Sequence, residues 1–332
     1  MRICIISNYN GLCDEGIKKV AEQISLRLQK CNEVLHINLR NFVFSLSSWS
    51  KLRQFNPQVL HVFLRPSPII FTILSAIKSI CTSSKIIITS LQPPCGNPFL
   101  LKITLLYLKP DVVLVQDHKT YNYFMNYFGF KISFLLGGVD LERFKPVSLN
   151  EKLSLREKYG FSKHQYIVLH VGHIFKGRNL DIFTEIQEIP NVQVLLVAST
   201  AFQPDSRLLK RLSDAGCLIW QKFISNIEEI YMLADCYVFP TKNNNNAILL
   251  PLSVLEAMSC NLPVISSNFG ALPEIFNEGE GLSFAKDDLE IIEKFQVCMG
   301  NNQEIKTRNK VIMYSWDNLV RDLEELYANV VA

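Results

Sequence analysis

Two basic side chains follow a short apolar segment near the middle of the chain. The segment YIVLHVG, residues 166–172, is typical of a buried strand, and HIFKGRNLDIF comes directly after it. This loop contains His173, Lys176 and Arg178, and a helix is expected to begin near Asn179. Two cations beside a helix N-terminus favour an anion such as a diphosphate, with arginine as a forked donor and lysine as a point charge. A solvated basic loop is the alternative.

A single carboxylate stands in an otherwise apolar segment, PLSVLEAMS, which begins at Pro251 and is predicted to be a helix. Ser253, Glu256 and Ser259 recur every three residues, so they are expected to form one narrow polar stripe. Glu256 can then project over the N-terminal end of the helix and accept two hydroxyl hydrogen bonds, as from the diol of a ribose. The alternative is that this carboxylate only complements the helix dipole, which is worth under ~1 kcal/mol.

Two further loops have residue types that suit a ligand. The run from Asn243 to Asn246, which includes Asn245, has amides that tolerate turns and can face a sugar, although such runs are also common in flexible loops. In the segment NYNGLCDEG, residues 8–16, Gly11 and Gly16 would allow a ligand to approach the backbone closely. That loop is not GxGxxG, so it lacks the fingerprint of a nicotinamide or flavin site.

Short apolar strands alternate with helical patterns in both halves of the chain. The predicted strands are 2–7, 33–39, 58–64, 84–90, 111–116 and 131–136, then 166–172, 192–199, 217–220, 235–239 and 263–267. This order predicts an α/β protein with two tandem doubly wound, Rossmann-like domains that face a cleft. The aperiodic segment 137–150 is predicted to be a linker, and the amphipathic tail 316–332 is expected to pack back on the first domain. Ligands are expected at the carboxyl ends of the strands.

The composition excludes several classes of protein. A net charge of +3 on 332 residues is too small to indicate nucleic acid, and nine unpatterned cysteines favour reduced thiols in the cytoplasm over disulfides or a zinc site. No DxD motif is present, so no metal site and no cofactor are expected. The apolar segments 67–80 and 99–108 are too short to cross a membrane and are interpreted as buried helices. The alternative is that they meet a lipid-linked acceptor.

Several blocks, taken in order, resemble the family 4 glycosyltransferases, which are retaining enzymes of the GT-B fold. The resemblance is carried by GGVDLERFKP (137–146), by HVGHIFKGRNL (170–180) and by PLSVLEAMSCNLPVISSNFGALPEIF (251–276). It is also carried by FISNIEEIYMLADCYVFPT (223–241). The resemblance implies an acceptor-binding domain at 1–148, joined by residues 313–332, and a nucleotide-sugar-binding domain at 149–312.

The resemblance also implies roles for individual residues. Lys176 and Arg178 would act at the donor diphosphate, and Glu256 would hold the donor ribose. The remaining donor-side residues would be Gly172, His173, Asn245, Asn246, Ile248, Leu249, Leu250 and Ser253, and the first-domain residues would be Gly11, Gly16 and Gln92. The chain departs from the family at two places. Ile248 stands where the first glutamate of the E-x7-E motif is usual, and Leu91 and Gln92 stand where many members carry a histidine.

These expectations describe a metal-independent glycosyltransferase that moves a sugar from UDP or GDP to a glycan or lipid-linked acceptor. It would act in the cytoplasm, with peripheral contact at the inner face of the membrane as a further option, and no nucleic-acid partner is expected. Three alternatives are open: a degenerate nucleotide-sugar-binding protein or partner subunit, an epimerase of the same fold, and a nicotinamide dehydrogenase. The missing glutamate favours the first, and the absent fingerprint disfavours the last. The sequence leaves the sugar, the base and the acceptor undetermined.

Overall fold

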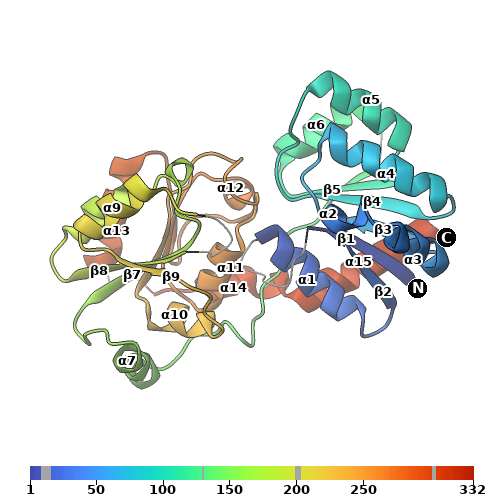
Figure 1. Cartoon of the computed structure of the whole chain (residues 1–332). Coiled ribbons are helices and arrows are strands. Elements are labelled where there is room, and N and C mark those ends of the chain that lie inside the picture. Colours follow the sequence, from blue (N-terminus) through green and yellow to red (C-terminus); the bar gives the residue numbers. More distant parts are fainter. Residues whose placement is uncertain (9–15, 129–130, 199–202, 301–303) are drawn as a thin grey trace. The chain divides into compact units, whose positions relative to one another are not determined.

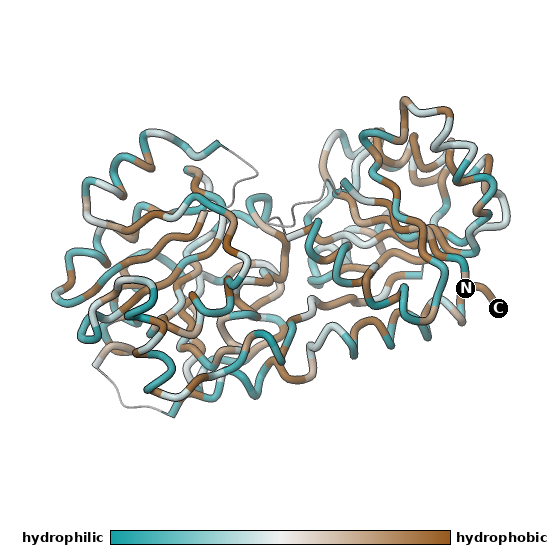
Figure 2. Tube along the Cα trace, turned by 60° about the horizontal axis from the view of Figure 1, so that its bottom comes forward, coloured by the Kyte–Doolittle hydropathy of each residue, from teal (hydrophilic) through white to brown (hydrophobic). Residues whose placement is uncertain are grey.

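The chain divides into two compact units, shown in Figure 1, a computed structural model that describes residues 1–8, 16–128, 131–198, 203–300 and 304–332. The first unit comprises Met1–Gly137, the tripeptide Ile248–Leu250 and Trp316–Ala332, and the second comprises Gly138–Ala247 and Pro251–Ser315. Apolar segments run through the interior of each unit in Figure 2. Each unit therefore has a core of its own.

The first unit is built on a six-stranded parallel sheet in the order β2-β1-β3-β4-β5-β6. The strands are β1 (Arg2–Ser7), β2 (Glu33–Asn38), β3 (Val59–Val62), β4 (Lys85–Ser90), β5 (Val112–Val115) and β6 (Lys131–Phe134). The inner strands β3 and β5 are buried along their whole length. This explains why β5 is apolar throughout, and why β3 is apolar apart from His61, instead of alternating.

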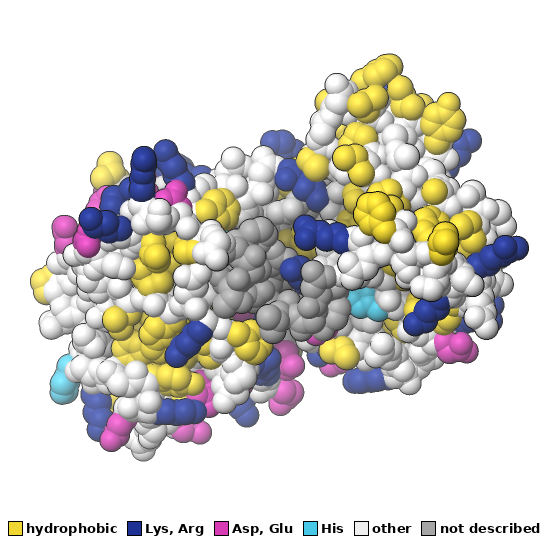
Figure 3. Space-filling model, viewed as in Figure 1, with side chains coloured by type: hydrophobic (Ala, Val, Ile, Leu, Met, Phe, Trp, Pro, Cys, Tyr) yellow, Lys and Arg dark blue, Asp and Glu magenta, His cyan; other side chains and the backbone are white. Residues whose placement is uncertain are grey.

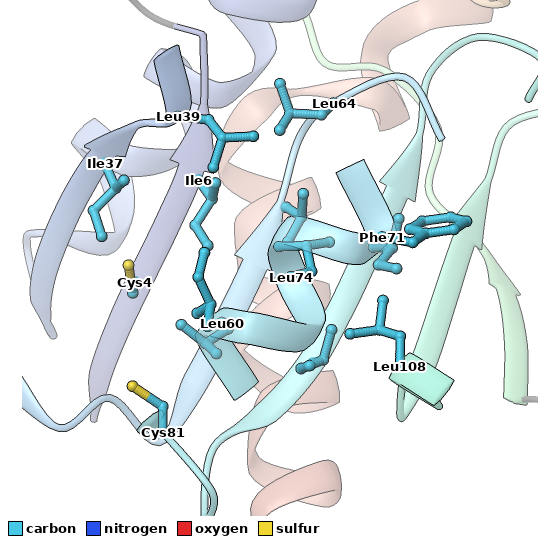
Figure 4. Packing of buried hydrophobic residues seen from close by; sticks show 14 of the residues in the cluster. Cys4, Ile6, Ile37, Leu39, Leu60, Leu64, Phe71, Leu74, Cys81 and Leu108 are labelled. Carbon is cyan, nitrogen blue, oxygen red and sulfur yellow. The ribbon is translucent and has the colours of Figure 1, made fainter. Parts of the chain in front are cut away.

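Helices cover both faces of this sheet, as βαβ order requires. One face is packed by α2 (Leu39–Phe42), α3 (Leu46–Phe55), α4 (Pro68–Ile80), α5 (Pro98–Leu108) and α6 (His118–Phe128). Figure 4 shows the apolar side chains of this core, with Phe71 and Leu74 of α4 beside Leu108 of α5. Both α4 and α5 begin with a proline after a side-chain cap, Ser67 and Asn97 respectively, which is a strong local start signal.

The last helix, α15 (Trp316–Val331), belongs to the first unit, where it packs beside α1 (Gly16–Leu28). The side chain of Tyr327 is fully buried, and its hydroxyl lies 2.5 Å from Nδ1 of His61 on β3. The other ring nitrogen of His61 lies 2.6 Å from the Thr89 hydroxyl on β4. The expectation that the C-terminal helix packs back on the first domain is therefore confirmed.

The second unit has a second six-stranded parallel sheet, in the order β12-β11-β10-β7-β8-β9. Its strands are β7 (Tyr166–Gly172), β8 (Val192–Ala198), β9 (Leu218–Gln221), β10 (Cys236–Phe239), β11 (Val264–Ser267) and β12 (Leu282–Ala285). The sequence did not predict β12. The α/β class with two doubly wound domains is confirmed by the two parallel sheets.

The helices of the second unit are mostly short. They are α7 (Leu149–Lys158), η1 (Lys176–Arg178), α8 (Ile182–Gln187), α9 (Ser206–Asp214), α10 (Ile227–Leu233), α11 (Leu252–Ser259), α12 (Leu272–Ile275), α13 (Asp288–Gly300), α14 (Thr307–Val311) and η2 (Ile312–Tyr314). Helices α8, α9 and α13 pack on one face of the sheet in a shared apolar core. The first unit stops at Gly137, at the start of the predicted linker, and α7 then opens with a capping box between Ser148 and Glu151.

Candidate functional site

The loop after β7 forms a tight basic turn. Lys176, Gly177 and Arg178 make the 3₁₀ helix η1, and Asn179 follows in the left-handed region at φ 58°. The side chain of Asn179 donates to Asp288 at 2.7 Å, which anchors the end of the turn. Helix α8 begins at Ile182, so the helix start predicted near Asn179 was wrong by three residues. Lys176, at the start of this turn, is exposed to solvent.

Arg178 lies inside the same turn and is buried, with 7% of its surface exposed. Its Nε donates to the backbone oxygen of Asn246 at 3.1 Å, and its guanidinium lies 5.7 Å from the centre of the Phe175 ring. It makes no ion pair with any carboxylate in the described parts of the chain. Burial lowers the pKa of its guanidinium to about 10. A buried cation without a counter-charge is costly, so this position favours an incoming anion.

Gly172, at the carboxyl end of β7, makes room for this arginine. A Cβ at Gly172 would stand 2.5 Å from Nη1 of Arg178 and 3.3 Å from Nε2 of His170. A Cβ at this distance would displace the guanidinium, so the glycine permits Arg178 to lie against the end of the strand. Gly177 has a similar constraint, because its Cβ would stand 2.4 Å from Nδ2 of Asn246.

The asparagine run holds the basic turn in place. The side chain of Asn246 donates to the backbone oxygen of Gly177. Within the run, the backbone N–H of Asn245 donates to the side chain of Asn243 at 2.9 Å, and the side chain of Asn244 accepts from the Gly270 N–H at 3.2 Å. Through these contacts Asn246 positions Arg178. Asn245, in contrast, is exposed to solvent.

Two histidines lie close to the turn. His170, which the sequence analysis did not single out, is fully buried, and its Nδ1 donates to the Val238 oxygen at 2.9 Å. Nε2 is then the acceptor nitrogen, and it has no hydrogen-bond partner among the described residues. Burial lowers the pKa of His170 to about 3, so the ring is neutral. His173, a predicted donor-side residue, is half-buried and its ring lies 6.5 Å from that of Phe175.

Glu256 lies on α11 and is buried, with 5% of its surface exposed, instead of projecting freely over the helix end as we expected. Its Oε2 accepts a hydrogen bond of 2.9 Å from the hydroxyl of Tyr231 on α10. The ring of Tyr231 stacks on that of Tyr237 at 5.9 Å between centres. Neither tyrosine was predicted as a site residue, because each stands directly beside apolar residues in its own element.

Tyr237 connects the carboxylate to the basic turn. Its hydroxyl donates to the backbone oxygen of Val171, next to Gly172, at 3.4 Å. Burial raises the pKa of Tyr237, while the nearby Ser253 hydroxyl and the Arg178 charge oppose that shift. Ser253 is half-buried, one turn before Glu256 on α11. The structure therefore brings the predicted residues Gly172, Arg178, Asn246, Ser253 and Glu256 into one connected region of the second unit.

The remaining predicted residues belong to the first unit. A Cβ at Gly16 would stand 3.1 Å from Cδ1 of Ile248, so Ile248 packs closely over this glycine. The backbone N–H of Leu249 donates to Leu91 at 2.8 Å, and that of Leu250 donates to the Gln116 side chain at 3.1 Å. The backbone N–H groups of these two predicted donor-side residues are therefore already hydrogen-bonded within the first unit.

The last two predicted first-domain residues are Gln92 and Gly11. Gln92 is half-buried, and its backbone oxygen accepts from Ser90 at 2.8 Å. Gly11 lies outside the described residues.

Neither a metal-binding cluster nor a membrane-spanning helix is present among the described residues. No group of three His, Cys, Asp or Glu side chains there is arranged so that it could hold a metal ion. In the same residues, no helix has both the length and the apolar composition that crossing a bilayer requires.

The second unit is similar in sequence to a known protein family. Residues 165–301, which contain the whole region around Arg178 and Glu256, match the family described as glycosyl transferases group 1. The chain is similar to family 4 glycosyltransferases, and its two Rossmann-like units have the GT-B fold. The family resemblance stated from the sequence is thus confirmed, and it is strongest in the second unit.

Individual relatives agree with this family. The chain is 28% identical over 224 residues to the UDP-Gal:alpha-D-GlcNAc-diphosphoundecaprenol alpha-1,3-galactosyltransferase of Escherichia coli, covering 60% of this chain and 55% of that protein. It is 24% identical over 213 residues to the alpha-galactosylglucosyldiacylglycerol synthase of Streptococcus pneumoniae, covering 61% and 56%. The chain thus spans a little over half of the length of these relatives.

Solved structures match over almost the whole chain. The sucrose-phosphate synthase of Thermosynechococcus elongatus superposes with a TM-score of 0.80 at 14% identity, covering 99% of this chain and 98% of that one. Anabaena HepE in complex with UDP-glucose superposes with a TM-score of 0.75 at 14% identity, covering 99% and 100%. At this level of identity the likeness supports the shared fold.

Proposed function

We propose that this chain is a retaining glycosyltransferase that moves a sugar from UDP or GDP to a glycan or lipid-linked acceptor. In the reaction, the bond between the anomeric carbon and the diphosphate breaks, and a bond from the acceptor hydroxyl oxygen to that carbon forms. The acceptor proton goes to the leaving diphosphate, so no protein nucleophile is required. Neither a metal nor another cofactor is needed in this proposal, because fixed cations can stabilise the leaving group.

The observation that carries the proposal is the buried Arg178 beside the exposed Lys176. Arg178 has no counter-ion among the described residues, yet its surroundings are fixed by Gly172, Asn246 and Phe175. A rigid fork of N–H donors at the end of a parallel strand suits a diphosphate, and a flexible lysine next to it adds a second charge. Such pre-positioned charges stabilise developing negative charge without reorganisation.

Glu256 is proposed to bind the ribose of the donor. Its second oxygen accepts from Tyr231, and a carboxylate has lone pairs enough for further hydroxyl donors. Tyr237 contacts both Tyr231, the partner of Glu256, and the end of β7 near Arg178. The two charged groups are therefore connected through this tyrosine without forming an ion pair. We infer that the nucleoside binds at the Glu256 end of this region and the diphosphate at the Arg178 end.

The names of relatives support the choice of substrates. HepE was solved with UDP-glucose, the Escherichia coli relative is named for UDP-Gal and a diphosphoundecaprenol acceptor, and the Streptococcus relative is named as a synthase of a glycosylated diacylglycerol. These names favour a UDP sugar as donor and a lipid-linked acceptor for this chain. We therefore propose that the protein acts in the cytoplasm at the inner face of the membrane.

A thermal-shift screen against UDP and GDP sugars tests the donor assignment. A sugar nucleotide at 100 times its Kd should raise the free energy of unfolding by about 2.7 kcal/mol. Release of free UDP or GDP on addition of undecaprenyl-diphosphate saccharides or diacylglycerol glycosides would then identify the acceptor class. Absence of a shift with all sugar nucleotides would contradict the proposal.

A catalytically degenerate binding protein or partner subunit is the second candidate, and Ile248 favours it. An apolar side chain packed over Gly16 replaces the carboxylate that is usual at this position. The backbone N–H groups of the next two residues already donate hydrogen bonds within the first unit. Activity assays distinguish the transferase from the binding protein, because a binding protein gives the thermal shift but neither donor hydrolysis nor sugar transfer.

A further inference from the structure

One long stretch of the first unit has no acidic residue. Between Glu33 and Asp111 the sequence contains no Asp and no Glu, although the whole chain has 31. The same stretch contains eight basic residues: Arg40, Lys51, Arg53, Arg65, Lys78, Lys85, Lys102 and Lys109. Helices α3, α4 and α5 all lie within it. Helices α3, α4 and α5 therefore have basic residues but no acidic ones.

Helix α5 is apolar on its outer side as well as on its inner side. Leu101, Leu105 and Leu108 are buried against the sheet. On the outer side Phe99 and Leu100 are 68% and 51% exposed, and Leu106 and Tyr107 are 49% and 80% exposed. A helix that is apolar all round normally has a covering partner on both sides.

The neighbouring helix extends this surface. Ile69, in the first turn of α4, is 73% exposed, and α4 packs alongside α5. We call Ile69, Phe99, Leu100, Leu106 and Tyr107 the α4–α5 patch. Figure 3 shows hydrophobic side chains gathered on the outer surface of the first unit where α5 lies. Large contiguous apolar patches on a protein surface indicate an interaction site.

Lysines stand within and beside the patch. Lys102 is exposed on α5, three residues after Phe99 and four before Leu106, so it lies on the same side of the helix. Lys109 is exposed directly after the helix, where it adopts a left-handed conformation at φ 46°. Long lysine stems can lie along apolar surface while their ammonium groups reach polar headgroups.

We propose that the α4–α5 patch docks on an anionic lipid surface, with α5 lying in the plane of the interface. Lipid headgroups supply the negative charges that the stretch from residue 34 to residue 110 lacks, and the acyl boundary accommodates Phe99 and Leu106. Tyr107 has the amphipathic ring typical of membrane interfaces. A second copy of this chain fits less well, because it would bring the lysines of two copies together without an acidic partner.

Vesicle co-sedimentation of the full chain tests this docking surface independently of sugar transfer. The protein should bind equimolar phosphatidylglycerol–phosphatidylcholine vesicles and bind pure phosphatidylcholine much more weakly, and the difference should shrink at high salt. The double variant F99Q/L106Q should lower the partition coefficient at least about tenfold, since each side chain loses apolar burial. The variant K102E/K109E should lower it on anionic vesicles by at least about tenfold and have little effect on neutral ones.

The matched controls are L289Q and K163E, which change an exposed leucine and an exposed lysine of the second unit and should leave binding unchanged. Each variant should also keep the thermal shift with its sugar nucleotide, so that loss of the donor site is distinguished from loss of docking. Absence of binding to anionic vesicles would overturn the proposal. So would equal binding by the patch variants, or a wild-type dimer in solution that F99Q/L106Q dissociates.

Discussion

The two units share one architecture but differ in how they treat buried polar groups. In the first unit, His61 is fully buried and both ring nitrogens are bonded, one to Tyr327 and one to Thr89. In the second unit, His170 is equally buried, but its Nε2 has no partner among the described residues. Arg178 beside it has no carboxylate partner there either.

The buried polar groups of the first unit therefore stabilise the fold, whereas those around Arg178 in the second unit suit a ligand. Buried polar atoms are normally satisfied, so an unsatisfied cluster is expected where something else binds. The Thr241 hydroxyl, in the loop after β10 of the second unit, also lacks a hydrogen-bond partner within the described chain. In the first unit the Nε2 of Gln116 is the comparable atom, and its side-chain oxygen accepts from Leu250.

The largest expected effect comes from Lys176→Ala. We expect turnover to fall at least ~10²-fold, as when one donor to a developing anion is removed. The melting temperature should not change, because Lys176 is exposed and makes no ion pair in the described chain. Steady-state transfer assays measure the loss, with Lys163→Ala as the control. Normal turnover in Lys176→Ala would remove its catalytic role.

The variant Glu256→Gln should weaken donor binding by about tenfold or more, because a hydrogen bond to a charged group is worth roughly 1.5–3 kcal/mol. Glutamine still accepts from Tyr231, so the fold is retained. Calorimetric titration with UDP and GDP measures the change. An unaltered Kd would show that the carboxylate serves α10 packing and not the ribose.

The variant His61→Leu tests the structural role of the buried histidine in the first unit. It leaves the Tyr327 and Thr89 hydroxyls buried without their partner, so the free energy of unfolding should fall by about 2 kcal/mol. Donor affinity should be unaffected. Urea denaturation gives the stability, with exposed His164→Leu as the control. If donor binding fell as much as stability, the two units would not be separable in this way.

Because His61 and His170 are buried, we expect the free energy of unfolding to depend on pH. Burial lowers the pKa of His61 and of His170 to about 3, whereas an unfolded histidine titrates near 6.5. Below pH 6.5 the unfolded chain binds protons that the folded chain does not, so stability falls as pH falls. Each histidine should cost about 1 kcal/mol between pH 6.5 and 5.5. The difference between wild type and His61→Leu should therefore shrink over this interval, and a constant difference would contradict it.

Much of the fold could be predicted from periodicity alone. Strands β1 and β7 match the predicted ranges, because both are continuous apolar runs bounded by polar loops. Strand β12 was missed because LSFA is short and follows the segment NEGEG, which has no strand pattern. Strand β3 ends two residues before the predicted end, shortly before Pro66.

The candidate site was predicted less completely. Lys176 and Arg178 were found because charged residues after an apolar strand are conspicuous. Their different exposures could not be predicted, since burial of Arg178 depends on the Asn246 oxygen and on the space above Gly172. His170, Tyr231 and Tyr237 were missed because buried polar residues within apolar segments have no periodic signal. Their roles depend on partners distant in sequence.

Calorimetric comparison of a nucleoside diphosphate with its nucleoside tests most directly whether the second unit holds a diphosphate at Arg178. UDP or GDP should bind at least about tenfold more tightly than uridine or guanosine, since the diphosphate adds charge-assisted hydrogen bonds. Arg178→Gln should abolish that preference while leaving nucleoside binding intact, and Lys163→Gln should preserve it. Equal affinities for diphosphate and nucleoside in the wild type, or a preference that survives in Arg178→Gln, would contradict the account.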